Sequence, residues 1–327
     1  MNTSITPTRF RLAVQAVFTL FCIYVGLRFV AFLAWAVGTT EVFTPKPGAV
    51  EGFLPISALL GLRRLLTTGQ WDSVHPAGLA IFIAVLLMAF LFRKGFCGYI
   101  CPVGFLSGLL ERLGRRMGLG VIPPKLIDLP LTGLKYLLLG GFLFAIFSMD
   151  TRSLESFISS PFNLVSDAKM LHFFMKPTLL SLLAIGVLVV LNVVIRNFWC
   201  RYLCPYGALL GLFSWAGPSC IRRNTTTCID CGKCAKACPA GITVQTKKVV
   251  RSPECIGCGE CVGVCPIDDC LGFSLNGRKR IPWLTIGIGC VATLLLVWGL
   301  ARMTGHWDST MPKDMIRNIY STMLEKI

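Results

Sequence analysis

The sequence predicts a mainly α-helical membrane protein of about five transmembrane helices, with a small α+β module inserted before the fifth helix. Three observations lead to this fold class: the apolar composition, a motif that recurs at an offset of 103 residues, and a dense group of cysteines. Of the 327 residues, 54% are hydrophobic and only 15% are charged, whereas a soluble domain carries roughly 25% charged residues. This composition is typical of a membrane protein.

Five apolar segments approach or exceed the length needed to cross a bilayer, about 20 residues. They cover residues 12–37, 76–92, 131–149, 177–195 and 281–303. The first follows Arg9 and Arg11, as a signal peptide would. Its apolar region is longer than the roughly 7–15 residues of a signal peptide, so we expect a retained helix.

The basic residues predict the orientation of these helices. With the N-terminus in the cytoplasm, the cytoplasmic segments hold 21 Lys and Arg residues and the opposite segments hold 10. Membrane proteins carry such an excess on the cytoplasmic side. We therefore expect a multi-pass protein of the bacterial inner membrane, with the inserted module in the cytoplasm and the C-terminus in the periplasm. This topology accounts for the net charge of +16, and nucleic acid is not an expected partner.

An internal repeat organises the first four helices. The segment FCGYICPVG at 96–104 matches WCRYLCPYG at 199–207, and each copy lies where an inward-running helix ends. The proline suits the first turn of a new helix. Two parallel repeats and a fifth helix give a 2+2+1 arrangement. The predicted segments are a cytoplasmic N-terminus (1–11), two membrane repeats (12–104 and 105–219), the inserted module (220–280), the fifth helix (281–303) and a periplasmic tail (304–327).

Eight cysteines of the insert form two runs with the spacing Cys-x-x-Cys-x-x-Cys-x-x-x-Cys-Pro. In two-cluster ferredoxins, three cysteines of each run bind one [4Fe–4S] cluster and the fourth binds the other cluster. We therefore predict two clusters and two ligand sets. The first set is Cys228, Cys231, Cys234 and Cys265, and the second set is Cys255, Cys258, Cys261 and Cys238. Structural zinc sites show paired Cys-x-x-Cys motifs instead.

Several residues around these runs complete the prediction. Gly232, Gly257 and Gly259 free the backbone to turn its amides toward cluster sulfurs. Cys220 and Cys270 flank the module outside both runs, and we assign them no ligand role. Cys-x-x-Cys-His does not occur, which excludes c-type haem.

The remaining motif cysteines are those of the repeat: Cys97, Cys101, Cys200 and Cys204. A thiol near a helix N-terminus has a lowered pKa, so we expect thiolate character. If the repeats pack about a pseudo-two-fold axis, the four thiols converge. Three interpretations stay open: a further metal centre or cluster, a pair of redox dithiols, or reduced structural cysteines.

The paired motifs together with a two-cluster insert resemble the membrane-bound polyferredoxins of the NapH, NosR, MauN, YccM and CcoG type, with NapH-type quinol dehydrogenases as the nearest match. The resemblance implies electron transfer between the quinol pool and a periplasmic redox protein or another membrane redox subunit. It also implies a redox or metal role for the four repeat cysteines. The chain lacks the flavin-binding domain of NosR and the long C-terminal β-domain of CcoG, and its fifth helix and tail go beyond a four-helix NapH.

Two other functions compete with electron transfer. Soft thiolates suit Cu(I), which favours a copper reductase or a maturation factor for a respiratory enzyme, although no methionine-rich copper motif occurs. A structural anchor that holds a partner reductase through the outer tail is the third class.

Overall fold

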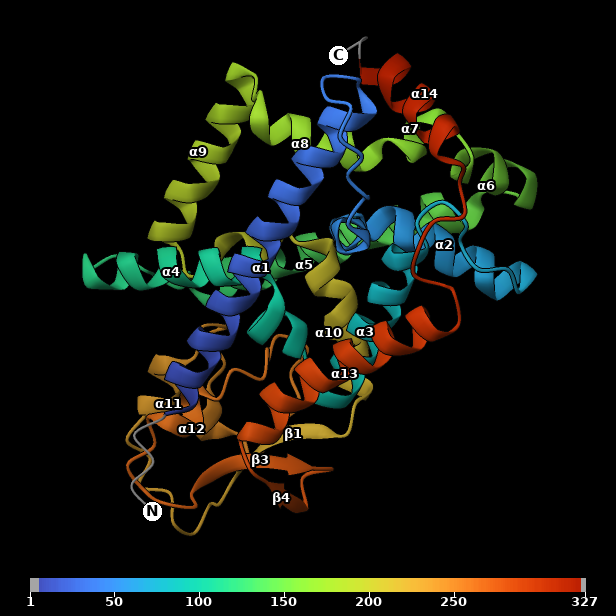
Figure 1. Ribbon diagram of the computed structural model, residues 1–327. Coiled ribbons are helices and arrows are strands. Elements are labelled where there is room, and N and C mark those ends of the chain that lie inside the picture. Colours follow the sequence, from blue (N-terminus) through green and yellow to red (C-terminus); the bar gives the residue numbers. More distant parts are fainter. Residues whose placement is uncertain (1–5, 325–327) are drawn as a thin grey trace. The chain divides into compact units, whose positions relative to one another are not determined.

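The computed structural model describes residues 6–324, and most of them are helical (Figure 1). Each apolar segment of the sequence forms a helix. These are α1 (Pro7–Ala36), α3 (Pro76–Phe92), α5 (Lys125–Ser148), α9 (Leu179–Val194) and α13 (Leu284–Met303). Three of them, α1, α5 and α13, are long and apolar enough to cross a membrane. Helix α3 has only 17 residues, and α9 follows α8 after a bend of 79°. The chain is thus a helical membrane protein, and the five-span arrangement stays a prediction.

Shorter helices occupy the segments between the apolar ones. They are α2 (Pro55–Thr68), α4 (Pro102–Arg116), α6 (Thr151–Ile158), α7 (Pro161–Leu164), α8 (Ser166–Met175), α10 (Pro205–Ala216) and α14 (Lys313–Leu324), with a 3₁₀ turn, η1, at Gly48–Phe53. Helices α4 and α10 confirm the expectation that a proline begins a helix after each repeated motif. The helices of the loops and tail, α2, α6, α7, α8 and α14, were not predicted.

The described chain forms two compact units that do not follow the predicted domain boundaries. The first unit combines the start of α1 with Val85–Gly141 and Ala184–Thr293. The second unit comprises Leu20–Ala84, Phe142–Leu183 and the chain from Leu294 onward.

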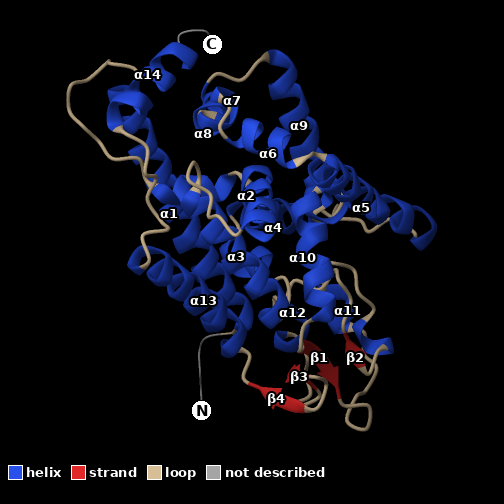
Figure 2. Cartoon of the chain, turned by 90° about the vertical axis from the view of Figure 1, so that its right-hand side faces the viewer, coloured by secondary structure: helices blue, strands red, loops and turns tan. Residues whose placement is uncertain are grey.

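The first unit contains a small ferredoxin-like module (residues 219–281), whose strands are red in Figure 2. The strands are β1 (Ser219–Arg223), β2 (Val249–Val250), β3 (Leu271–Leu275) and β4 (Lys279–Ile281). They form an antiparallel sheet in the order β2-β1-β3-β4, with Ile221 opposite both Val250 and Phe273. Two short helices, α11 (Lys233–Ala237) and α12 (Glu260–Gly263), and a 3₁₀ turn, η4 (Val244–Thr246), complete the module.

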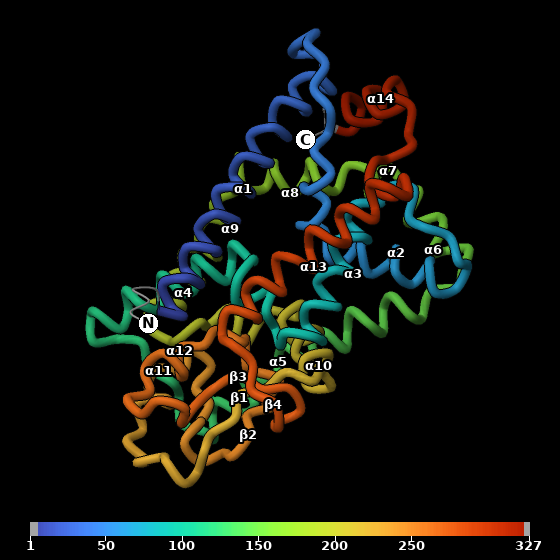
Figure 3. The backbone as a smooth tube through the Cα atoms, turned by 60° about the horizontal axis from the view of Figure 1, so that its bottom comes forward, coloured from blue at the N-terminus to red at the C-terminus, as the bar shows by residue number. Residues whose placement is uncertain are grey.

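The second unit has an aromatic core. Helices α2 and α6 contact each other, and α14 contacts α7 (Figure 3). The ring of Tyr320 on α14 packs edge-on against Phe32 on α1, with centroids 5.4 Å apart. Phe29, Trp35 and Val165 join this buried cluster. The core therefore fixes the C-terminal helix to the first apolar helix.

Candidate iron–sulfur and thiol sites

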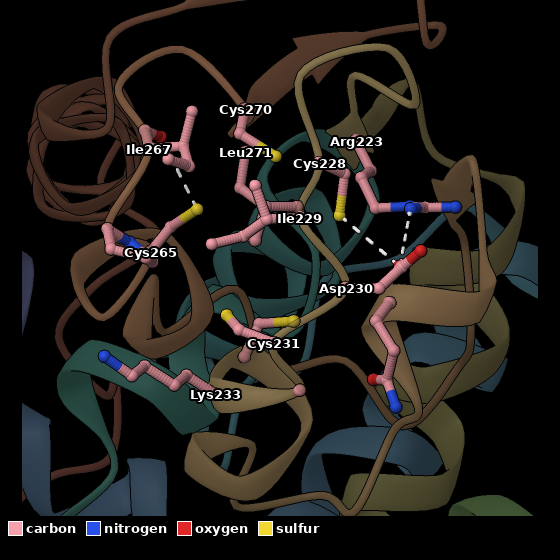
Figure 4. A pocket seen from close by; sticks show the side chains of 14 residues that line it. Arg223, Cys228, Ile229, Asp230, Cys231, Lys233, Cys265, Ile267, Cys270 and Leu271 are labelled. Carbon is pink, nitrogen blue, oxygen red and sulfur yellow. Dashed lines mark hydrogen bonds and ion pairs between the residues drawn. The ribbon is translucent and has the colours of Figure 1, made fainter.

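The ferredoxin-like module contains two small cavities, and Figure 4 shows the side chains that line the first one. The first cavity is lined by all four cysteines of the first predicted ligand set. Cys231 is exposed and Cys234 is buried, so the cavity borders solvent on one side. A fifth cysteine, Cys270, also lines it.

The second cavity is lined by all four cysteines of the second predicted set. Cys238, Cys258 and Cys261 are buried, and Cys255 is half-buried. The second cavity is thus better shielded from water than the first. The structure brings each predicted set together at one cavity and keeps the two sets apart.

Glycines shape the loops around both cavities. Gly232 and Gly259 adopt left-handed conformations, with φ of 70° and 72°, which L-residues with side chains rarely adopt. Each one directly precedes a short helix, α11 or α12, that carries the third cysteine of its run. A hollow surrounded by four cysteine thiols has the donor set of a [4Fe–4S] cluster, whose protein ligands are cysteine thiolates.

The two repeated motifs have the same local structure. Cys97 lies in the π-helix η2 (Phe96–Ile100), and Cys200 lies at the equivalent position of the π-helix η3 (Trp199–Leu203). Cys101 and Cys204 are the N-caps of α4 and α10. Each of these two thiols accepts a hydrogen bond from the backbone N–H three residues later, at 3.4 and 3.3 Å. Such π-turns are frequent at functional sites.

The four repeat cysteines lie together within the first unit. The thiol of Cys97 interacts electrostatically with those of Cys200 and Cys204, and the thiol of Cys101 with those of Cys97 and Cys204. Burial raises the pKa of Cys97, Cys101 and Cys200 to about 12. The expectation of thiolates was wrong for the metal-free protein, because desolvation outweighs the favourable helix N-termini. A bound metal would displace these protons.

Within residues 6–324, no three Cys, His, Asp or Glu side chains are placed as ligands of a single metal ion. The thiols around a cubane cluster stand further apart than those around one ion, so this finding concerns single ions.

Two buried lysines, Lys94 and Lys135, pair with Glu254 of the ferredoxin-like module and act on one of the repeat thiols. The ammonium groups of Lys94 and Lys135 lie 3.7 and 2.5 Å from the same oxygen of Glu254, and Tyr136 donates to the other oxygen at 2.9 Å. Burial alone would raise the pKa of Glu254, but the two lysines lower it below its usual value. Both lysines also act electrostatically on the thiol of Cys97. The two ammonium groups and the one carboxylate give this cluster a net charge of +1. The cluster lies beside neutral thiols.

The first repeated motif packs directly against the lining of the second cavity. A Cβ atom on Gly98 would lie only 2.6 Å from the carbonyl oxygen of Ile256. Any side chain at position 98 would therefore push the two backbone segments apart. The hydroxyl of Tyr99 donates to the carbonyl of Gly257 at 3.4 Å. Ile256 and Gly257 both line the second cavity. Glycine at position 98 therefore permits the closest approach between a repeat motif and a cluster cavity.

The second motif meets the module differently. Arg201, which occupies the position equivalent to Gly98, forms a bidentate ion pair with Asp128 at 2.6 and 2.9 Å. The hydroxyl of Tyr202 donates to the same carboxylate at 2.6 Å. A Cβ atom on Gly241 would touch the Arg201 guanidinium at 2.8 Å. A long side chain, rather than bare backbone, thus makes the second contact.

The second unit contains a buried polar network that the sequence did not reveal. Lys46 pairs with Glu51 at 3.0 Å and with Asp167 at 2.7 Å. Tyr320 donates to Asp167 at 2.9 Å, and the His75 ring lies 3.4 Å from Glu51. Lys46 and Glu51 are near neighbours in the sequence, but His75, Asp167 and Tyr320 lie far from them and share no motif spacing. Glu155 begins the segment ESFI, which is similar to EGFL at Glu51, but it pairs with Arg64 on a more exposed surface.

Comparison with protein families identifies both halves of the chain as iron–sulfur segments. Residues 74–120 and 177–224 match one family model, described as a 4Fe-4S binding domain. These two segments contain the repeated motifs. Residues 221–273 match a 4Fe-4S dicluster domain, and this segment contains both cavities.

Several known proteins are similar over long stretches. YccM of Escherichia coli, whose name assigns it to electron transport, is 40% identical over 322 residues, which cover 95% of this chain and 90% of YccM. The methylamine utilization ferredoxin-type protein MauN of Methylorubrum extorquens is 29% identical over 58% of this chain and 62% of MauN. The regulatory protein NosR of Pseudomonas aeruginosa is 31% identical over 45% of this chain and 20% of NosR. No solved structure matches the chain.

Proposed function

Because the chain belongs to the family of membrane-bound ferredoxin-type proteins that includes YccM, MauN and NosR, we propose that it carries electrons between the quinol pool and a periplasmic redox partner. The observation that carries this proposal is the pair of cavities, each lined by the four cysteines of one predicted ligand set. Cysteine-ligated clusters supply one-electron redox centres, which is the chemistry that an electron carrier needs.

We assign the two cavities distinct places in the chain of electron transfer. The first cavity borders solvent at Cys231 and is suited to exchange electrons with another membrane redox subunit on the cytoplasmic side, whereas the periplasmic partner lies on the opposite side of the membrane. The second cavity is shielded and touches the first repeat motif through Gly98 and Tyr99. The order of sites is then the first cavity, the second cavity and the four repeat thiols.

The four repeat cysteines act as a third centre in this proposal. Their thiols converge, and both matched segments that contain them are described as 4Fe-4S binding. The excess positive charge of the lysine cluster next to Cys97 favours an anionic occupant, such as a thiolate-bound metal centre, over neutral structural thiols. Redox dithiols are the remaining alternative.

The topology of the proposal follows the basic residues. Five helices cross the bilayer in a 2+2+1 arrangement, α3 and α9 being the two short ones. The segments before α1 and between α9 and α13, including the ferredoxin-like module, lie in the cytoplasm, and the tail after α13 lies in the periplasm. The predicted repeat and module boundaries are retained.

A copper reductase or maturation factor is the second candidate, because four converging thiols also suit Cu(I). Metal analysis separates the two functions. Anaerobically purified protein should contain about eight iron atoms from the two cavities, and more if the repeat thiols hold a further cluster. Copper at one ion per chain, bound in the absence of iron at the repeat cysteines, would favour the second candidate.

Electron transfer itself is tested with a quinol analogue and a soluble acceptor. Cys258→Ala removes a buried ligand of the second cavity and should abolish transfer. Cys220→Ala, a buried cysteine that lines neither cavity, is the matched control and should retain transfer. Full transfer by Cys258→Ala protein that lacks the second cluster would refute the proposed role.

A further inference from the structure

The two cluster cavities differ in the number of cysteines that line them. The second cavity has four, which is the number a cubane cluster takes. The first has five, because Cys270 lies at its wall although it belongs to neither cysteine run. One thiol at the first cavity is therefore in excess of the ligand requirement.

The position of Cys270 differs from that of the other extra cysteine of the module. The thiol of Cys220 lies 3.3 Å from the hydroxyl of Ser274, its cross-strand neighbour in the sheet, and Cys220 lines neither cavity. Cys270 precedes β3, and its thiol has a longer contact of 3.7 Å with the carbonyl oxygen of Asn224. Packing in the sheet thus explains Cys220 and does not explain the placement of Cys270 at the cavity wall.

Cys270 is held next to one particular ligand. The backbone N–H of Asn224 donates to the carbonyl of Cys270 at 2.7 Å, so Cys270 lies at the base of the loop that carries Cys228. The thiol of Cys270 also interacts electrostatically with those of Cys265 and Cys228. In Figure 4, Cys270 lies near Cys228 and Cys265 at the upper end of the cavity, and Cys231 lies at the lower end.

We propose that Cys270 is a reserve ligand of the first cluster and can replace Cys228. This inference rests on the proposed cluster in the first cavity. Cys228 is half-buried on a loop without regular structure, whereas Cys270 is buried and is fixed by two backbone hydrogen bonds, one to Asn224 and one to Ile267. The reserve thiol is the better protected of the two.

The exchange is balanced without any other reactant. The bond between iron and the Cys228 sulfur breaks, and a bond between the same iron and the Cys270 sulfur forms. The proton of the Cys270 thiol passes to the released thiolate of Cys228. No electron is gained or lost, so the oxidation state of the iron is unchanged.

Iron content and EPR spectra of anaerobic variants test the exchange. Cys228→Ala should keep the iron content of the unaltered protein and the signals of both reduced clusters. Cys228→Ala combined with Cys270→Ala should lose about four iron atoms per chain. Cys228→Ala combined with Cys220→Ala is the matched control and should resemble Cys228→Ala alone. Equal loss of iron in Cys228→Ala and in the Cys228→Ala/Cys270→Ala protein would overturn the inference.

Two further variants keep the test decisive. Cys231→Ala should lose the first cluster even with Cys270 present, because Cys231 lies at the other end of the cavity. Unchanged iron both in Cys231→Ala and in Cys231→Ala combined with Cys270→Ala would reject the proposed cluster itself. If Cys228→Ala does not accumulate, Cys228→Ser takes its place in the test. An EPR spectrum typical of four thiolate ligands would then support the exchange. A serine-ligated spectrum that is unchanged by a further Cys270→Ala substitution would overturn it.

Discussion

Replacing Glu254 by Gln should destabilise the first unit strongly. The carboxylate of Glu254 balances Lys94 and Lys135, whose side chains are 3% and 0% exposed. Gln keeps the shape and the hydrogen bond to Tyr136 but leaves two like charges buried together. Removing one partner of a buried ion pair costs about 3–5 kcal/mol. For a unit of this size, that loss corresponds to a fall in the unfolding midpoint of roughly 6–20 °C.

Thermal unfolding in detergent, followed by circular dichroism, measures this loss. Asp230→Asn is the matched control, because Asp230 also adjoins a cluster cysteine but is 73% exposed in its pair with Arg223. An exposed pair contributes about 0–1 kcal/mol. Lys135→Met should cost less than Glu254→Gln, since Lys94 still pairs with the carboxylate. An unfolding midpoint of Glu254→Gln equal to that of Asp230→Asn would refute the reasoning.

Three further predictions concern other parts of the chain. Serine substitution of one repeat cysteine should reduce electron transfer as much as substitution of one cysteine in each motif, because substitutions of residues that act as a unit have non-additive effects. Iron in the two cavities should be retained. Defects of the two motifs that multiply independently would contradict a shared site. Burial alone would lower the pKa of His75, but Glu51 raises it above the usual 6.5. The stability of the second unit should therefore be full below pH 6.5 and fall as the pH rises through the higher pKa of His75 in the folded state. His75→Gln should remove this pH dependence of thermal unfolding, and His306→Gln should not. A periplasmic reporter fused after Ile327 should be active and a cytoplasmic reporter inactive; the reverse result would invert the topology.

The apolar helices and the grouping of the cluster cysteines could be predicted because both depend on local sequence. Hydropathy over about 20 residues indicates a helix in lipid, and a short spacing such as that between Cys228 and Cys234 keeps thiols on one loop. The crossed arrangement of the two runs, with Cys265 at the first cavity and Cys238 at the second, also follows from their spacing. Their roles as ligands stay predictions.

Features that depend on tertiary contacts could not be predicted. Lys46, Asp167 and Tyr320 meet in the second unit although Asp167 and Tyr320 both lie more than a hundred residues after Lys46. The pKa of the repeat thiols was predicted in the wrong direction, because a helix N-terminus is visible in the sequence and the depth of burial is not. Cys270 was set aside for a similar reason: its distance from Cys228 in the sequence hides their shared cavity.

Because Gly98 and Arg201 differ, the two copies of the repeated motif contact the ferredoxin-like module in different ways. Two identical motifs would offer two equivalent routes for electron transfer between the four thiols and the module. Here only the first copy meets the second cavity through bare backbone, and the second copy is spaced from the module by a guanidinium that Asp128 holds in place. In the proposed electron transfer, duplication provides the four thiols, and the difference at this one position favours transfer through the first copy.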